Sequence, residues 1–377
     1  MSNTNMDKLY PEFWAMGWDA IDMGQYNLHN MVSKDASVEV QKAGTTVDVM
    51  LQPDLGDPET YDGVTVTAKD IAQESVKITL DKGKQKTITL SSKELSLSPY
   101  DLIKNYAAPM AKSIISQISK DVYAELIGSK YFVDATAGLS ESLLIDAGTA
   151  LSNNDVDDMN RQLACSPAAY GALLKIAALS AADGTGDGGA ARKDGQLLNR
   201  YGFAIGKDNG IKKYTPVDVA GAVNNSGTAY AAGATTIAVD GFNDDANPIR
   251  IGDMFKIADE TGTPFHTVIS TKTTSSDTTE ITFYPALKDG AANDAVVTVT
   301  PTQSAIAFTP AACGLAMRAW AEIPEGLGVQ SSIINANGIP VRVSVWQSDL
   351  NIKVQYATLY GVKRYRDERI VRLVNVL

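Results

Sequence analysis

Histidine and cysteine are scarce in this chain of 377 residues, which has two of each. His29 and His266 stand far apart in the sequence, so a metal site that needs two imidazoles at ligand spacing cannot be built in one chain. Two cysteines exclude a disulfide scaffold and a four-cysteine zinc site. We therefore predict no metal and no cofactor. We interpret Cys165 and Cys313 as small buried apolar residues, and both histidines as polar residues of a loop or strand.

Catalytic motifs are lacking as well. No G-x-S-x-G elbow surrounds a serine, and neither cysteine has the sequence context of a cysteine enzyme. Gly184, Gly186 and Gly189 match the phosphate-binding expression G-x-G-x-x-G, but they follow an alanine-rich helix and lie with Asp183 and Asp187, which would repel phosphate. We predict a flexible loop there, with weak calcium binding as an alternative that lacks the spacing of an EF-hand. The chain is not expected to be an enzyme.

Positive charge is in deficit, because 33 Lys and Arg residues stand against 44 Asp and Glu residues, a net charge of −11 at pH 7. This balance argues against a free-standing DNA- or RNA-binding protein, which would neutralise phosphates with a basic surface. The acidic group of Asp155, Asp157 and Asp158 is interpreted as a solvated helix end.

Long apolar runs are missing too. The most apolar helical stretch, residues 168–182, is about fifteen residues long and contains Lys175, so it is too short and too polar to cross a bilayer. Residues 1–9 carry Asp7 and no apolar run, and no secretory signal is predicted. We expect a soluble intracellular product without membrane contact.

The composition includes 44% apolar residues, enough to give two or three structural units a core. Residues 10–31 have a density of large apolar side chains, among them Trp14 and Trp18, that is unusual for a polypeptide end. Such an arm would aggregate if it lay free in water, so it must be covered by its own domain or by another subunit. We name both tryptophans as candidate subunit-contact residues, with an ordinary packed N-terminal segment as the alternative.

Residues 38–97 predict a long two-stranded arm. Apolar residues alternate with the strand period in several short runs between residues 38 and 90, and turn-forming residues fill 53–63. Because an isolated hairpin is marginal in water, we expect the tip, residues 52–73, to obtain most of its order from a neighbouring subunit. Tyr61 is the one aromatic residue of the tip and the third candidate subunit-contact residue, with an exposed turn residue as the alternative.

A long helix is predicted over residues 99–127. Ser98 has the N-cap position and Pro99 the first helical position, and the apolar residues that follow keep the helical period. Pro109 cannot donate a hydrogen bond to the carbonyl four residues earlier, so we expect a bend near it. Shorter helices are predicted over 141–151 and 167–179, and a strand around 162–165.

Residues 216–304 differ in composition from their flanks, being rich in Thr, Ala, Gly and Asp and free of a helical pattern. They hold four Lys and Arg residues against eleven Asp and Glu residues, a net charge of −7. Short strands are predicted at 235–239, 249–257, 266–271, 280–284 and 295–300. This alternation of strands and turns is typical of a small antiparallel barrel, and we expect an inserted domain. Strands follow at 305–308 and, as one unusually long run, at 340–360.

The order of these features resembles that of the major capsid proteins of tailed phages, which share the Hong Kong 97 fold. An apolar arm, a long hairpin, a helix capped by Ser-Pro, and a strand-rich run over residues 352–363 followed by the basic 366–372 occur in the same order. Short motifs resemble the branch of this family that carries a β-rich insertion domain. They are I-G-D-M-F at 251–255, F-Y-P-A-L at 283–287, A-F-T-P-A-A at 307–312 and E-I-P-E-G at 322–326.

The resemblance implies an α+β fold in seven segments. These are an N-arm (1–37), an extended loop with basal strands (38–97), a peripheral domain with the spine helix (98–165), a first part of an axial domain (166–215), the insertion domain as a small antiparallel β-barrel (216–304), a second axial part (305–340), and the long peripheral strand with a closing axial strand (341–377). Lys69 lies on the extended loop, but no partner for a covalent cross-link is identified, and cross-linking is not predicted.

The resemblance also implies the function of a major capsid protein. Copies would form hexamers and pentamers and close an icosahedral shell around a double-stranded DNA genome, in a virion assembled in the host cytoplasm. The implied partners are other copies of the chain, scaffolding and portal proteins, a decoration protein in some members, and a genome that is contacted without sequence specificity. The alternatives are an encapsulin-type compartment shell, a secreted β-rich fibre or adhesin, and, with least support, an enzyme whose site carries no recognisable motif.

Overall fold

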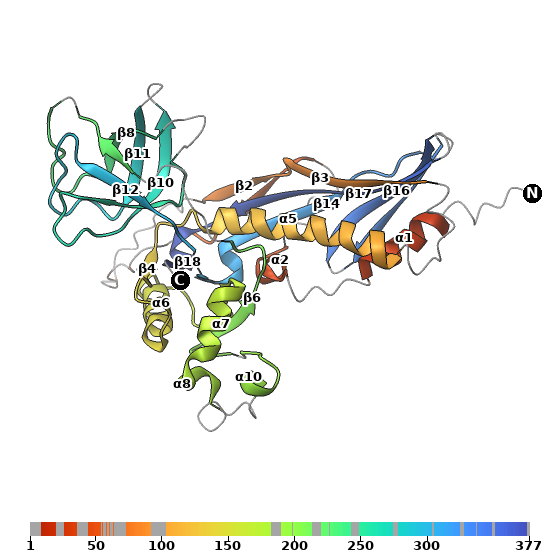
Figure 1. The fold of residues 1–377 in the computed structure, drawn as a ribbon, viewed down its shortest axis with the longest axis horizontal. Coiled ribbons are helices and arrows are strands. Elements are labelled where there is room, and N and C mark those ends of the chain that lie inside the picture. Colours follow the sequence, from red (N-terminus) through yellow and green to blue (C-terminus); the bar gives the residue numbers. More distant parts are fainter. Residues whose placement is uncertain are drawn as a thin grey trace, which may run out of the picture. The chain divides into compact units, whose positions relative to one another are not determined.

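The computed structural model describes residues 9–19, 26–35, 44–53, 55, 58, 60, 63, 73–91, 103–181, 190–197, 199–212, 220–225, 227–242, 249–273, 278–303, 305–324, 328–336, 338–348 and 351–374. The chain divides into two compact units, each assembled from three separate segments. The first unit comprises Met1–Ile21, Ser33–Ile114 and Cys313–Tyr365, and the second comprises Asp22–Val32, Ile115–Ala312 and Arg366–Leu377. The structure is mixed α+β, as predicted (Figure 1).

The first unit is built on an antiparallel sheet whose main strand is β17 (Asn351–Arg364). The other strands are β3 (Lys82–Leu90), β14 (Cys313–Ala319), β15 (Val329–Ala336) and β16 (Ile339–Ser348). One edge of β17 pairs with β3, and the other edge pairs first with β16 and then with β14. Helix α1 (Leu9–Asp19) lies against β15 and β16. This long sheet gives the N-terminal helix a surface within its own chain.

The single long strand predicted over 340–360 is wrong, because the segment forms a hairpin of β16 and β17. Ser348 pairs with Asn351, so the chain reverses between these two residues. The intervening Asp349 and the polar Ser348 and Asn351 are turn-forming residues that interrupt an otherwise continuous run of strand formers. Both strands therefore belong to one sheet, with opposite directions.

A separate two-stranded ribbon is formed by β1 (Thr46–Met50) and β2 (Ser75–Thr79), which pair antiparallel with Thr46 opposite Thr79. This pairing confirms the predicted arm in its central part. The prediction was wrong for residues 82–90, which pair with β17 and not with the ribbon. Residues 36–43 and most of the predicted tip lie outside the described residues.

The long helix is present as α5 (Ala108–Leu126), preceded by a π-helical turn at Ile103–Ala107. The predicted apolar positions Met110, Ile114, Ile118 and Val122 are buried. Pro109 is the second residue of α5, and the wider π-helical turn lies directly before this helix. Pro109 has no backbone N–H, so it cannot form the α-helical hydrogen bond to the carbonyl four residues earlier, which lies in the π-helical turn. The predicted cap at Ser98 and Pro99 lies outside the described residues.

The second unit contains a five-stranded sheet in the order β4-β18-β13-β5-β6. Its strands are β4 (Phe132–Asp134), β5 (Arg161–Cys165), β6 (Phe203–Lys207), β13 (Ala305–Phe308) and β18 (Ile370–Val374). Its helical elements are α2 (Leu28–Met31), α6 (Glu141–Asn153), α7 (Pro167–Lys175), α8 (Ala177–Ser180) and α10 (Ala190–Lys193), with 3-10 turns at Pro310–Ala312 and Asp367–Arg369. One core joins the sheet to α6 and α7 through Leu144, Leu163, Leu173, Phe203 and Leu373. The helix predicted over 167–179 is interrupted at Ile176, which has an extended conformation.

A closed antiparallel barrel occupies most of residues 220–300, in the order β10-β11-β8-β7-β12-β9. Its strands are β7 (Ala220–Val223), β8 (Thr236–Asp240), β9 (Met254–Ile257), β10 (His266–Thr273), β11 (Thr278–Tyr284) and β12 (Val296–Thr300). Its own apolar core includes Val239, Phe255, Ile281, Phe283 and Val297. The strand predicted over 249–257 begins only at Met254, because residues 250–253 form a turn with Gly252 at φ +90°. The division into seven segments, with the barrel as an insertion, stays a prediction.

Candidate functional site

The two arm tryptophans lie on α1 and are buried in the first unit, Trp14 with 3% and Trp18 with 0% of its surface exposed. The ring of Trp18 meets Tyr356 of β17 edge to face, with centroids 5.7 Å apart. The Tyr356 hydroxyl donates a hydrogen bond to the backbone oxygen of Trp14, at 2.5 Å. Burial raises the pKa of this tyrosine far above its ordinary value. Both indoles are therefore covered by their own chain.

The burial of the two indoles bears on the two alternatives that the sequence left open for the arm. The apolar side chains of Trp14 and Trp18 need no second copy to be shielded, which agrees with the alternative of a packed N-terminal segment. Met16, on the same helix, is 59% exposed. A role of the two tryptophans in subunit contacts stays a prediction. Tyr61, the third candidate, lies outside the described residues.

The ribbon of β1 and β2 has one covered part and one exposed part. Val47, Ile78 and Leu80 form a small core with Ala316 of β14, within the first unit. Met50, at the far end of β1, is 74% exposed, and Leu55 beyond it is 70% exposed. The base of the ribbon thus packs against the sheet of its own unit. The apolar side chains of Met50 and Leu55 are exposed to solvent.

The histidines are more deeply buried than predicted. His29 is in α2 and fully buried, so it is not a loop or strand residue. His266 begins β10 and lies among the aromatic rings of Phe255 and Phe283 in the barrel. Its Nε2 forms a short contact with a carboxylate oxygen of Glu260, and its Nδ1 lies 2.8 Å from the backbone oxygen of Pro285.

Both cysteines are free and buried, which confirms their interpretation as apolar residues. Burial raises the pKa of Cys165 to about 12, so its thiol is held in the protonated, unreactive form. Within the described ranges no cluster of three His, Cys, Asp or Glu side chains could hold a metal ion. In the same part of the chain no helix is long and apolar enough to cross a membrane. The glycine-rich segment 184–189 lies outside the described residues.

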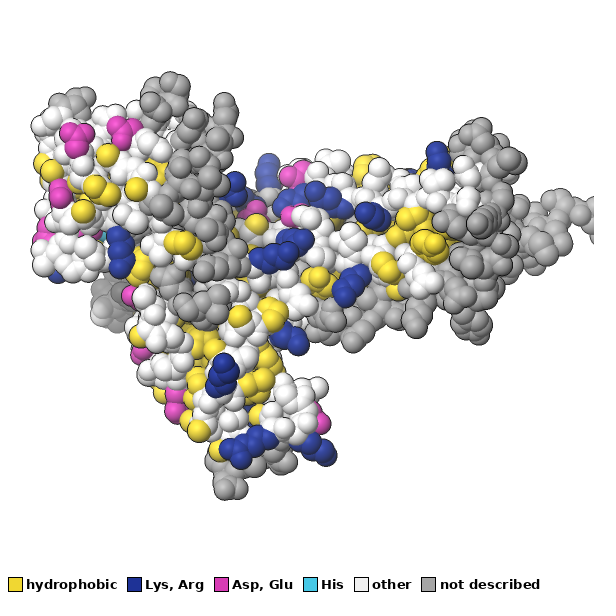
Figure 2. All heavy atoms as spheres, in the orientation of Figure 1, with side chains coloured by type: hydrophobic (Ala, Val, Ile, Leu, Met, Phe, Trp, Pro, Cys, Tyr) yellow, Lys and Arg dark blue, Asp and Glu magenta, His cyan; other side chains and the backbone are white. Residues whose placement is uncertain are grey.

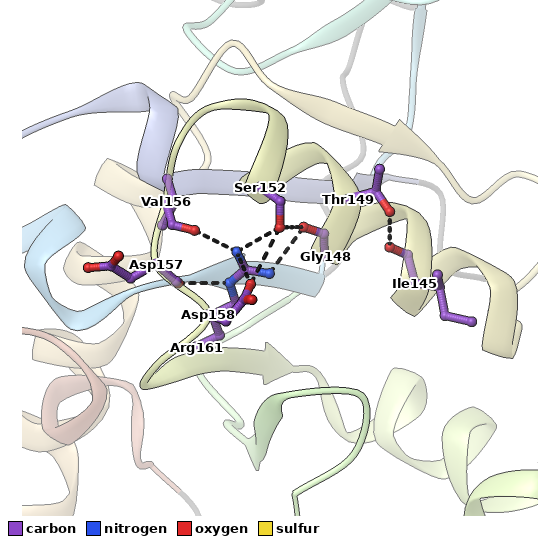
Figure 3. Close-up of polar contacts among 8 residues, drawn as sticks. All are labelled: Ile145, Gly148, Thr149, Ser152, Val156, Asp157, Asp158 and Arg161. Atoms are coloured by element: carbon purple, nitrogen blue, oxygen red, sulfur yellow. Dashed lines mark hydrogen bonds and ion pairs between the residues drawn. The ribbon is translucent and has the colours of Figure 1, made fainter.

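Arg161 organises the acidic loop that follows α6, a role that the sequence pattern did not reveal (Figure 3). Its side chain is 6% exposed and forms an ion pair of 2.8 Å with Asp158, which is 87% exposed. The guanidinium also donates to the backbone oxygens of Gly148, Val156 and Asp157 and to the hydroxyl of Ser152, over 2.6–3.1 Å. The acidic side chains of this loop are therefore exposed to solvent, as predicted. A buried arginine binds the backbone of the loop from the side of the protein interior.

We expect Arg161→Met to lower the free energy of unfolding by about 2–4 kcal/mol, because it leaves several partly buried carbonyl oxygens without this donor. Urea denaturation followed by circular dichroism measures this loss. Arg192→Met, on the exposed part of α10, is the matched control and should cost little. Asp158→Ala should also cost little, since exposed ion pairs contribute about 0–1 kcal/mol. A larger loss for Asp158→Ala than for Arg161→Met would contradict this account.

Comparison with known proteins identifies a fold and no close relative. No protein-family model matches the chain, and no curated protein does. Among solved structures, one from Mycobacterium phage Che8 is similar over 93% of this chain and 91% of its own, with 13% identity and a TM-score of 0.50. The capsid structure of the cyanophage P-SCSP1u matches over 91% of this chain and 89% of its own, with 12% identity and a TM-score of 0.47. A virus-like particle from Pyrococcus furiosus matches over 98% and 99%, with 13% identity and a TM-score of 0.42.

The assignment of the fold rests on the similarity to the Mycobacterium phage Che8 structure, since this similarity extends over nearly the whole of both chains. At 13% identity it establishes the fold and leaves function to be argued separately. The chain therefore shares its fold with this structure from a phage, which agrees with the resemblance to phage proteins that the sequence indicates.

Proposed function

We propose that the protein is the major capsid protein of a tailed phage, and that its copies assemble into an icosahedral shell around a double-stranded DNA genome. The observation that carries the proposal is the similarity of fold to the structure from Mycobacterium phage Che8 over 93% of the chain. In this role the chain acts mechanically, through contacts between copies, and performs no catalysis. Scaffolding, portal and decoration proteins are its further proposed partners, and the virion is its proposed location.

The ribbon supports the proposal of contacts between copies. A two-stranded ribbon is marginally stable in water, and only the base of this one is covered by its own sheet. The exposed Met50 at its far end is an apolar side chain that a neighbouring copy would cover. The net charge of −11 also fits a wall that encloses packed DNA without adhering to phosphate.

Assembly is tested on the full chain by sedimentation and negative-stain electron microscopy. We expect hexamers, closed particles or irregular sheets, and a stable monomer of 40.1 kDa at micromolar concentration would contradict the proposal. Closed particles from infected cells that protect DNA from nuclease would identify a viral coat. Particles that enclose protein and no DNA would identify the encapsulin-type alternative instead.

Substitutions in the ribbon and in the predicted tip should weaken assembly while the fold stays intact. We expect Met50→Asp, and independently Tyr61→Ala, to raise the concentration needed for assembly about tenfold, the effect of losing about 1.4 kcal/mol per contact. Light scattering across a concentration and salt series measures the change. Met159→Asp is the matched control, because Met159 is 78% exposed and lies in the second unit. Equal assembly by wild type and ribbon variants, or an equal loss in the control, would remove the ribbon from the interface.

A further inference from the structure

A pocket of about 390 Å³ opens within the second unit, beside the C-terminal half of α5. Its walls are formed by α5, by the segment that follows β6, by the turn before β9 and by β18. The charged lining residues are Lys120, Lys212, Arg250, Asp253 and Arg372. The volume is within the range of small-ligand sites, about 300–1,000 Å³. The function proposed above makes no use of this pocket.

The charge of the pocket is opposite to the net charge of the chain. Four cationic side chains from four different chain segments line it against one carboxyl group, although the chain as a whole carries −11. On the visible face of the barrel, several acidic side chains lie among uncharged and apolar ones (Figure 2). A concave site with one sign of charge focuses the electric field and raises the local concentration of the opposite ion.

The inner wall of the pocket is rigidly built. Arg372 is 1% exposed, and its guanidinium donates to the backbone oxygen of Gly252 at 2.8 Å and to the hydroxyl of Thr267 at 2.7 Å. A Cβ at Gly252 would lie 2.6 Å from the backbone oxygen of Ile127. The turn that contains Gly252 therefore packs directly against the residue that follows α5. Arg372 is thus held in place before any ligand arrives, which reduces the cost of ordering this side chain on binding.

We propose that this pocket binds a phosphate-type oxyanion, either free phosphate or the phosphodiester of a nucleic acid. Ammonium and guanidinium groups form charge-assisted hydrogen bonds with phosphate oxygens, and several of them converge here on one cavity. The hydroxyl-bearing side chains of Tyr123 and Thr302 also line the cavity. The site extends the proposed function without depending on it, because the pocket lies within a single chain.

Asp253 makes the site sensitive to pH. Its carboxylate accepts a hydrogen bond from the backbone N–H of Arg250 at 2.7 Å, and burial raises its pKa to about 6. The groups that share the pocket with it are Lys120 and Tyr123 of α5, Lys212, Arg250 and Arg372. Above about pH 6 the ionised carboxylate repels an anion, and below it the neutral acid does not, so binding should strengthen as the pH falls.

The test measures binding of inorganic sulfate and inorganic phosphate to the full chain by calorimetry at constant ionic strength. Sulfate keeps its charge between pH 5 and pH 8, so it isolates the effect of Asp253. We expect millimolar binding, at least about tenfold weaker in the double variant Lys120→Gln, Lys212→Gln. The control Lys175→Gln, Lys193→Gln removes the same charge from exposed positions outside the pocket and should bind as wild type does.

Asp253→Asn is the variant that separates the proposal from damage to the fold, because it should bind sulfate more tightly at pH 7 and lose the pH dependence. A short oligodeoxynucleotide forms the second arm. If it binds with the same variant pattern and free phosphate does not, the phosphodiester is the ligand; if both bind, free phosphate is sufficient. No anion binding, an equal loss in the control, or weaker binding by Asp253→Asn would overturn the proposal. Sedimentation of the same samples reports assembly separately, so failure of one proposal is distinguishable from failure of the other.

Discussion

Glu260→Ala should lower the stability of the barrel by about 3–5 kcal/mol, because removing the carboxyl group of a buried pair leaves its hydrogen-bond partners unsatisfied. Glu260 is 2% exposed and His266 is fully buried. One carboxylate oxygen of Glu260 contacts His266 Nε2, and the other accepts the backbone N–H of Lys288 at 2.6 Å. Alanine would leave the buried ring nitrogen of His266 and the partly buried backbone N–H of Lys288 without these partners. Hydrogen exchange of the amides of β9, β10 and β11 measures the loss.

Two further variants distinguish pairing from simple truncation. Glu260→Gln retains an oxygen that can accept the Lys288 N–H and an amide that can donate to the ring nitrogen, so it should cost less than alanine. Glu280→Ala, on β11 of the same barrel, removes a partly exposed carboxylate and should change exchange little. If Glu280→Ala loosened the barrel as much as Glu260→Ala, the buried pair would not be the cause.

Trp18→Ala should cost about 3–5 kcal/mol, the range for removing a large aromatic side chain from a core. The indole is fully buried and packs edge to face on Tyr356, whose hydroxyl holds the backbone of Trp14. Deletion of the ring opens a cavity between α1 and β17 and loosens the attachment of the arm. Chemical denaturation followed by the fluorescence of the remaining tryptophans measures the change.

Met16→Ala is the matched control for the role of the arm, because Met16 lies on the same helix and is 59% exposed. It should leave the free energy of unfolding within about 0.5 kcal/mol of the wild type. If α1 forms a subunit contact, this variant and not Trp18→Ala will weaken assembly with the fold unchanged. A Trp18→Ala chain that unfolds like wild type but fails to assemble would reverse the assignment of Trp18 to the core.

Elements with a strong local period could be predicted from the sequence. The apolar positions of α5 and the alternation in β8, β11 and β12 each specify one buried face. These three strands and β10 lie within about two residues of the predicted ones. The break in the helix at Ile176 and the late start of β9 were missed, because local propensity does not show where the backbone turns.

Other features depend on pairing across long sequence distances and left no local signal. β7 is composed of Ala, Gly and Val, and β14 begins Cys-Gly, so neither has the alternation of a half-buried strand. Arg161 and the Glu260–His266 pair form hydrogen bonds with residues of other segments. No sequence motif predicts these contacts.

The position of β18 has a consequence for the synthesis of the chain. This strand follows every other strand of its sheet in the sequence, yet it lies inside the sheet, parallel to β4 and antiparallel to β13. Until residues 370–374 have left the ribosome, β4 has no neighbour in the sheet and one edge of β13 is open. The five-stranded sheet can therefore be completed only after β18 has emerged, and until then the nascent chain carries an unpaired strand edge.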